Sequence, residues 1–428
     1  MERSDWKSAQ SKIFSLLSVS SPKLNPIQWW QQFPTALRLI TKTRFLASVG
    51  AGGVIYLTPL VFNQENLSAT EIGTGLALAA LIGTIARLVS GLLLDKGLNC
   101  SSLLRFTAVI GILGDLTLFN AYNYSSFLQG ELLIGIATGI YWPSIELAVP
   151  ISCGNFPSSR GFALGRSADA LGISIGATIG SIAAWVGAIR FIYLFDIFCM
   201  FFLIFLLTKK SFKNKVNKNE INSYEKTYDI NETTLWLKSL SPILLISLLT
   251  TGILSLQQSA LPIDLVNGGI NRPPLSEGWT SGLIAIQLFL LVLLQWPIGK
   301  WVSNKSLKYG FRTSIICLGS GCLLIGISSL WSLGAILIVT AQLPIAFGLA
   351  AFLPTATEAI VQEAPINRQG FSMALFSQCF AISAFISPII SGKILDQQGN
   401  GLILWTSVFI LCIVSLIPLS NKKYLPIK

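Results

Sequence analysis

Long apolar runs, separated by short polar segments, are the dominant pattern along this chain. The hydrocarbon core of a bilayer is about 30 Å thick, and a helix needs about 20 mainly apolar residues to cross it. The runs reach that length and are continuous rather than alternating, which favours helices over strands. We predict twelve spans: Phe45 to Asn63, Ile72 to Leu94, Leu103 to Tyr122, Phe127 to Val149, Phe162 to Trp185, Ile189 to Leu207, Leu240 to Val266, Trp279 to Val302, Thr313 to Leu330, Leu333 to Ile360, Phe371 to Leu395 and Leu402 to Leu419.

A repeated pattern divides these spans into two halves. The segment "YWPSIELAVPISCGNFPSSRGFAL" begins at Tyr141, and "AFLPTATEAIVQEAPINRQGFSMAL" begins at Ala351. Gly91 and Gly299 are 208 residues apart in matching "GLLLDKG" and "GKWVSNK" segments, while Pro143 and Pro354 are 211 residues apart. The spacing indicates a duplicated unit of six helices. Because six is an even number, both copies enter the membrane from the same side, and an axis along the membrane normal relates them.

The polar segments around these halves complete the predicted organisation. Residues 1–44 form an N-terminal segment on the cytoplasmic side, 45–207 the first bundle, 208–238 a cytoplasmic linker, 239–420 the second bundle and 421–428 a tail. The linker is rich in lysine and too polar to pack. The N-terminal segment contains "IQWWQQFPTALRLITKTRF", which leaves open an amphipathic stretch at the membrane surface or a targeting peptide.

Composition and charge placement agree with a membrane protein, since 52% of the 428 residues are hydrophobic and only 11% are charged. The formal net charge of +11 raises the question of a nucleic-acid partner. With alternate connections assigned to one side, 26 of the 30 Lys and Arg fall there, and only Arg190, Arg272 and Lys393 fall on the other. This positive-inside asymmetry places both termini in the cytoplasm. We therefore expect no nucleic-acid partner and a multi-pass protein of a bacterial-type cytoplasmic membrane.

Several motifs in this layout resemble those of the major facilitator superfamily of secondary transporters. They are "GLLLDKG" after the second span, the Glu to ArgGly pattern after the fourth and tenth spans, and "SPIISGKILDQQGNG" in the eleventh. The resemblance covers Phe45 to Leu419. It implies an all-α integral membrane protein of twelve transmembrane helices, in two six-helix bundles related by pseudo-two-fold symmetry. The chain departs from the family where Lys96 is followed by "GLNCSS" and where "GISIGATIG" in the fifth span lacks the proline of the antiporter signature.

Acidic and basic residues recur near the cytoplasmic ends of corresponding spans. Glu146 and Glu358 come near the ends of spans four and ten, and Arg160 and Arg368 begin the spans that follow. We expect each Glu to face an Arg across one loop. The resemblance implies that these residues, together with Asp95 and Lys96, form a network that holds an inner gate shut. The alternative is that these charges only set the topology.

Ionisable residues also fall inside the predicted spans, where each costs about 2.5–3.5 kcal/mol on insertion scales. They are Arg87, Asp115, Glu131, Asp169 and Asp196. Arg87 and Asp169 lie at similar depth, about 12 Å from the cytoplasmic edge, with Asp115 somewhat deeper. We predict that Arg87 pairs with one of these two carboxylates. Either a static ion pair or a pair that opens or protonates during transport fits this prediction.

The resemblance implies that spans one, four, seven and ten line a central cavity. The candidate substrate-binding residues there are polar or aromatic: Tyr56, Glu131, Tyr141, Trp142, Gln257, Gln258 and Gln342. The alternative is that the aromatic side chains pack and the glutamines bridge helices. Glycines at four-residue spacing predict close helix crossings rather than chemistry; they are Gly172, Gly176 and Gly180 in span five, and Gly135 and Gly139 in span four.

The sequence indicates no cofactor and no metal. It contains no histidine, no CxxC pair and no P-loop, which argues against His-ligated metals and direct ATP hydrolysis and leaves carboxylates as intramembrane proton carriers. We predict a monomeric secondary transporter, not an enzyme, that moves a small solute by alternating access, with proton coupling left open and lipids as its surroundings. The alternatives are a transport-fold sensor or assembly factor and a membrane-embedded enzyme acting on a lipid-linked substrate.

Overall fold

All secondary-structure elements in the described part of the chain are helices. A computed structural model describes residues 30–154, 156, 158–209, 230–303, 305–364 and 369–420. The helices are α3 Thr35–Gln64, α4 Ala69–Asp95, α5 Cys100–Phe119, α6 Tyr124–Cys153, α7 Ser158–Trp185, α8 Phe191–Lys209, α9 Ile230–Ser259, α10 Leu261–Asn267, α11 Glu277–Ser303, α12 Leu307–Ser328, α13 Gly334–Glu363, α14 Gln369–Gln398 and α15 Leu402–Ser420. Most of the predicted linker and the predicted tail lie outside the described residues.

Each predicted span corresponds to a helix, with two differences. Among the described residues, eleven helices are long and apolar enough to cross a membrane, and Leu402–Ile417 is a shorter apolar helix. The seventh span is divided at Ala260 into α9 and α10, where Pro262 occupies the first turn of α10. Proline suits that position because the first turn needs no backbone N–H.

The first helix is longer than the apolar run predicts. Helix α3 begins at Thr35, directly after Pro34, and not at Phe45. Residues Arg38, Lys42 and Arg44 therefore belong to a membrane-spanning helix. The sequence pattern missed the stretch from Thr35 to Arg44 because three cations interrupt its hydrophobicity.

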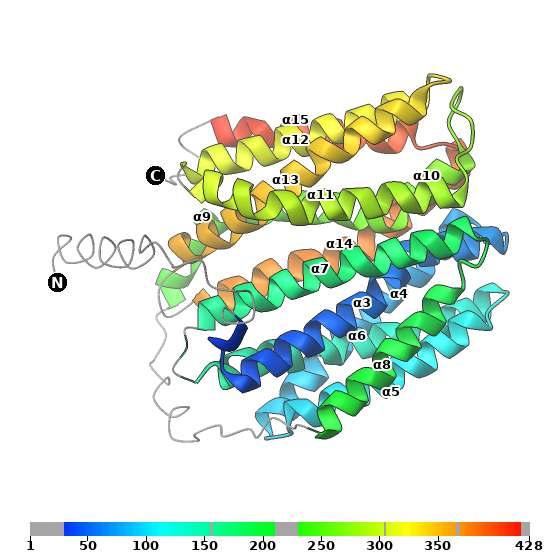
Figure 1. Ribbon diagram of the computed structural model, residues 1–428. Coiled ribbons are helices and arrows are strands. Elements are labelled where there is room, and N and C mark those ends of the chain that lie inside the picture. Colours follow the sequence, from blue (N-terminus) through cyan, green and yellow to red (C-terminus); the bar gives the residue numbers. More distant parts are fainter. Residues whose placement is uncertain are drawn as a thin grey trace.

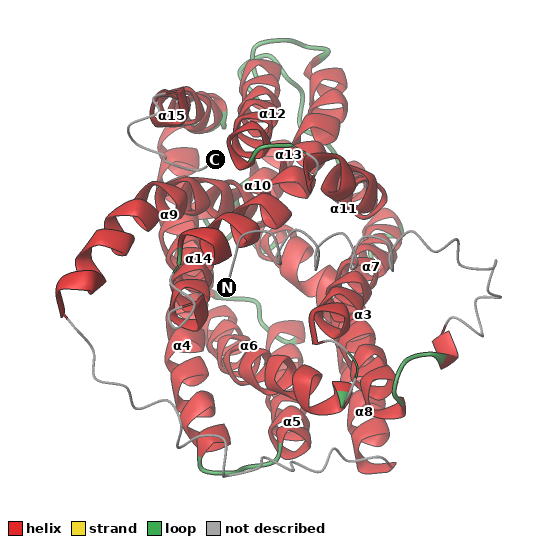
Figure 2. Cartoon of the chain, turned by 90° about the vertical axis from the view of Figure 1, so that its left-hand side faces the viewer, coloured by secondary structure: helices red, strands yellow, loops and turns green. Residues whose placement is uncertain are grey.

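Two groups of six spans make up the molecule. Helices α3 to α8 pack chiefly among themselves, and α9 to α15 do the same. The two groups lie one above the other in Figure 1, and α3 begins on the same side of the molecule on which α15 ends. We call this the terminus side and the opposite one the far side. Viewed from the terminus side, the two groups meet along α4 with α14 and along α7 with α11 (Figure 2).

Glycines bring backbone against backbone within the first bundle. A Cβ at Gly172 would collide with the carbonyl of Phe45 on α3, and one at Gly176 would collide with the carbonyl of Val49. Gly139 on α6 meets the carbonyl of Gly83 on α4 in the same way. The predicted close crossings are confirmed at all five glycines, since Gly135 and Gly180 are also crowded by neighbouring helices.

The arginines of the far side hold loops to the helix ends. Arg190 donates to the carbonyls of Phe119 and Ala121, both at 2.6 Å, and pairs with Glu65 at 2.9 Å. It therefore satisfies carbonyls that the end of α5 leaves without intrahelical donors. This structural role explains why Arg190 lies on the far side, where positive charges are few.

Arg272 has an equivalent role in the second bundle but is fully buried. It donates to the backbone carbonyl of Asp264 at 2.6 Å, to its carboxylate at 3.3 Å and to Ser328 at 2.8 Å. The Asp264 carboxylate also accepts from Trp405 Nε1 at 3.0 Å and from the Gly401 amide at 2.8 Å. This network ties α10, α12 and α15 together.

Candidate functional site

A buried arginine on α3 joins carboxylates from two other helices. Arg44 exposes only 1% of its side chain. Its Nε donates to both carboxylate oxygens of Asp169 on α7, at 3.1 and 3.0 Å, and its Nη2 donates to Asp169 as well. Its Nη1 and Nη2 donate to Glu146 on α6 at 3.2 and 3.1 Å. Ser48, one turn along α3, donates to Asp169 at 3.2 Å. We call Arg44, Glu146 and Asp169 the Arg44 cluster.

Packing around the Arg44 cluster explains how the arginine fits. Gly165 on α7 leaves room for it, since a Cβ there would lie 3.0 Å from Arg44 Cδ. The Trp142 ring lies 5.8 Å from Arg44 Cζ, close enough for a cation–π contact. Tyr141 packs edge-on against Trp142, with ring centroids 5.5 Å apart. Two carboxylates face one guanidinium, so the cluster carries a formal net charge of −1 when all three groups are ionised.

The predicted pairing of Arg87 is wrong. Asp169 pairs with Arg44, and Asp115 has no hydrogen-bond donor near it among the described residues. Arg87 instead reaches across to the second bundle, where its Nη1 lies 3.5 Å from the Ser377 hydroxyl on α14. Arg44 rather than Arg87 pairs with Asp169 because α3 packs directly against α7 along its length, whereas α4 packs against α6 and α14.

Three buried carboxyl groups form a second cluster inside the first bundle. Asp115 on α5 and Asp196 on α8 face each other closely enough to share a hydrogen bond when one is protonated. Glu131 on α6 is close enough to interact electrostatically with Asp115. All three are buried, and none makes an ion pair within the described residues. Glu131 therefore belongs with Asp115, and it lies about 15 Å along α6 from Tyr141.

The three predicted cavity glutamines of the second bundle differ in their hydrogen bonding. Gln258 on α9 donates to the Tyr56 hydroxyl on α3 at 3.4 Å, so this pair joins the two bundles. Gln342 donates to the carbonyl of Ile338 in its own helix at 2.9 Å. Both amide atoms of Gln257 are buried without a hydrogen-bond partner among the described residues. Gln257 therefore has unused hydrogen-bonding capacity, whereas Gln342 is partly satisfied by its helix.

The predicted gate is described only in part. Glu146 belongs to the Arg44 cluster, and Glu358 is exposed and accepts from Gln362 of the same helix at 3.0 Å. Lys96 is exposed directly after α4. The side chains of Asp95 and Arg160 lie outside the described part of the structure, and so does the whole of Arg368. The pairing of Arg160 and Arg368 with the two glutamates stays a prediction, and so does the place of Asp95 in the gate network.

The two bundles meet on the far side through contacts that the sequence did not point to. Asp396, near the end of α14, accepts from the backbone amides of Ala69 at 2.9 Å and Thr70 at 2.7 Å, which are the first residues of α4. It is thus a helix cap supplied by the other bundle. Gly73 packs against the carbonyl of Pro388, and Gly392 packs against that of Ala69. Helices α4 and α14 therefore touch backbone to backbone at this end.

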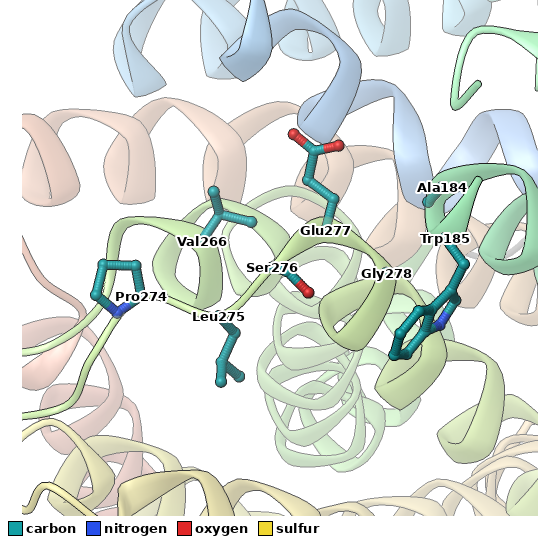
Figure 3. Close-up of a pocket in the computed structure, with 8 residues that line it drawn as sticks. All are labelled: Ala184, Trp185, Val266, Pro274, Leu275, Ser276, Glu277 and Gly278. Carbon is teal, nitrogen blue, oxygen red and sulfur yellow. The ribbon is translucent and has the colours of Figure 1, made fainter. Parts of the chain in front are cut away.

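A second far-side contact joins α7 to α11. The Trp185 and Trp279 rings pack edge-on with centroids 5.4 Å apart, and Ser281 lies 3.4 Å from Ser181. Gln64 at the end of α3 donates to Glu277 at the start of α11. A pocket of about 570 Å³ lies here, lined by Ala184, Trp185, Val266, Pro274, Leu275, Ser276, Glu277 and Gly278. Figure 3 shows the Trp185 indole beside Gly278, with the Glu277 carboxylate pointing away from it.

Comparison with known proteins was made at the level of sequence and of fold. No family model matches the chain. The Multidrug resistance protein MdtG of Citrobacter koseri is 24% identical over 196 residues, covering 45% of this chain and 47% of the relative. The MdtG of Escherichia coli strain K12 / DH10B is 25% identical over 202 residues, covering 46% and 48%. The chain thus matches about half the length of these curated relatives.

Solved structures match over almost the whole chain. The nucleoside transporter NupG has a TM-score of 0.74 at 12% identity and covers 90% of this chain and 98% of its own. A POT family transporter in complex with 5-aminolevulinic acid has a TM-score of 0.71 at 16% identity, covering 90% and 96%. At such low identity the likeness shows the fold alone. The predicted arrangement, with twelve spans in two six-helix bundles, is confirmed.

Proposed function

We propose that this protein, whose fold is that of the major facilitator superfamily, is a secondary transporter that carries a small solute by alternating access. The strongest support is the far-side interface, in which a few polar contacts and two glycine crossings hold the bundles together. Such contacts form in one state and break in the other, and their free energy sets the balance between the states. With both termini in the cytoplasm, as the charge placement favours, closure on the far side corresponds to the inward-facing form.

The solute class that we propose is an amphipathic organic compound, neutral or cationic. Glu146 exposes 35% of its side chain and Trp142 is 37% exposed, one helical turn apart on α6. An accessible indole beside an accessible carboxylate suits a cation with an apolar body. The name of the MdtG relatives, multidrug resistance protein, agrees with an organic solute of this kind.

We further propose that transport is coupled to protons through Asp115, Asp196 and Glu131. Burying an unpaired carboxylate is costly, and two facing carboxylates without a cation cannot both stay ionised cheaply. The pair therefore holds a proton in the described conformation. Because Asp196 packs against Gly50 of α3 and Asp115 lies on α5, a change in the packing of α3 against α8 alters the space around this proton.

Flux in proteoliposomes tests the proposed function. Purified protein should carry a radiolabelled lipophilic cation such as tetraphenylphosphonium, and an imposed pH gradient should drive its accumulation. Asp115→Asn should abolish accumulation driven by the gradient but keep exchange of labelled for unlabelled cation, because exchange needs no net proton movement. Glu71→Gln, at a partly exposed carboxylate in the first turn of α4, is the matched control and should behave as the wild type.

Two outcomes count against this proposal, in part or in whole. Accumulation of the cation that does not depend on the pH gradient would contradict proton coupling but not transport. Absence of flux for cationic and neutral amphipathic solutes, in protein that a solute nonetheless stabilises against heat, would favour a transport-fold sensor instead.

A further inference from the structure

A groove of about 310 Å³ lies along the seam between α3 and α7, near the N-terminal ends of both helices. Helix α3 contributes Thr41, Lys42 and Phe45, and Trp30 adds an indole from the segment before it. The residues from α7 are Leu164, Ser167, Ala168 and Leu171. Their spacing of three and four residues places them on one face of α7.

This groove is separate from the Arg44 cluster. Successive residues of a helix are about 100° apart, so the Lys42 side chain leaves α3 about 200° away from that of Arg44. Arg44 turns inward to α6 and α7 and is buried, whereas Lys42 is exposed. The groove therefore lies on the opposite side of the α3–α7 seam from the Arg44 cluster.

The groove surface is almost wholly apolar, and a cation lies at one end of it, which is the order that a phospholipid requires. That end holds the stem of the exposed Lys42 and the amphipathic Trp30, at the level where the continuous apolar run of α3 has not yet begun. Its apolar end holds Phe45 and Leu171, which lie deeper in the bilayer. Indoles and lysines are typical of the level of the lipid headgroups, where the lysine stem stays in apolar surroundings.

The charge of Lys42 is not neutralised by any of the described residues, among which this lysine makes no ion pair. Arg38 lies one turn before Lys42, so the two cations share a face of α3, and the buried Arg38 Nε has no acceptor in the same part of the chain. Two cations on one face of the helix, next to an apolar groove, complement a lipid phosphate.

We propose that this groove binds an anionic phospholipid of the leaflet on the terminus side. The Lys42 ammonium meets the phosphate, with Arg38 beside it, and an acyl chain lies along Phe45, Leu164 and Leu171. A zwitterionic phospholipid offers the same chain with no net charge and binds more weakly. This site is independent of the solute pathway and of the proposed function.

Quenching of Trp30 by brominated lipids tests the site in the full-length protein. Reconstituted protein is compared in phosphatidylcholine vesicles that contain either dibrominated phosphatidylglycerol or dibrominated phosphatidylcholine. Subtracting the signal of Trp30→Phe isolates the contribution of Trp30 from those of the other tryptophans. The wild type should show Trp30 quenched at lower mole fractions of phosphatidylglycerol than of phosphatidylcholine. Lys42→Gln should reduce this preference about five-fold, the effect of one lysine near an anionic surface.

Controls keep the outcome decisive. Lys308→Gln removes a terminus-side lysine on α12, away from the groove, and should leave the preference unchanged, as should Lys42→Arg. If Lys42→Gln does not fold, Ser167→Phe fills the groove from an exposed position and should abolish the quenching. The site is refuted if both lipids quench Trp30 equally in the wild type or if the groove variant keeps the preference. Absence of any Trp30 quenching would mean that other protein covers the groove, which also refutes it.

Discussion

Replacing Asp396 by Asn weakens the far-side interface at one defined point. The carboxylate accepts two backbone hydrogen bonds at the N-terminus of α4. Hydrogen bonds to a charged group contribute about 1.5–3 kcal/mol each, and a negative charge at a helix N-terminus adds about 0.3–1 kcal/mol. Asparagine keeps one acceptor and loses the charge, and the bond to Thr70 is exposed to solvent. We expect a net loss of about 1–2 kcal/mol from the closed state, which corresponds to a 5- to 30-fold change in the ratio of states.

Distance measurements between spin labels report that ratio directly. Labels on Ser125 of α6 and Ile336 of α13 sit at exposed far-side positions of the two bundles, in a background with the seven free cysteines replaced. Asp396→Asn should increase the population with long distances between the labels. Glu71→Gln removes a carboxylate from the same helix end but caps only its own bundle, so it should leave the distribution unchanged. If Asp396→Asn gives the wild-type distribution, Asp396 does not hold the far side closed.

Three further predictions concern stability, each measured by unfolding in detergent. Arg44→Met leaves two carboxylates without their cation and should cost about 3–5 kcal/mol, whereas Arg44→Met with Asp169→Leu should recover part of it; equal losses in both would contradict the ion-pair interpretation. Gly176→Ala pushes a methyl group into the Val49 carbonyl and should cost about 1–3 kcal/mol, while Gly91→Ala, which meets nothing within 4 Å, should be neutral. Asp264→Leu leaves the fully buried Arg272 without its carboxylate and should cost about 3–5 kcal/mol. Glu65→Gln, at the partly exposed Arg190 pair, should cost about 1 kcal/mol or less; similar losses would show that burial does not set the difference.

Local pattern predicted the elements of this fold well, because the membrane forces each span to be apolar over a fixed length. The glycine crossings were also predictable, since spacing along one helix shows which face lacks side chains. The start of α3 could not be predicted in this way. Arg38, Lys42 and Arg44 read as a surface segment, although Arg44 is buried by carboxylates that lie 102 and 125 residues away in the sequence.

Polar pairings between helices could not be predicted from one sequence. Depth in the membrane placed Arg87 beside Asp169 and left Arg44 outside the first span, and only the packing of α3 on α7 shows that Arg44 pairs with this carboxylate. Asp396 offered even less signal. A single acidic residue at a helix end is typical of a solvated surface, and its partners are backbone amides 327 and 326 residues away.

The seam between α3 and α7 has a mechanical consequence. Where Gly172 and Gly176 touch the carbonyls of Phe45 and Val49, no layer of side chains is left that could slide or compress. Helices α3 and α7 are therefore expected to move as one body along this seam. Under the alternating access proposed above, widening at one end of this helix pair would accompany narrowing at the other.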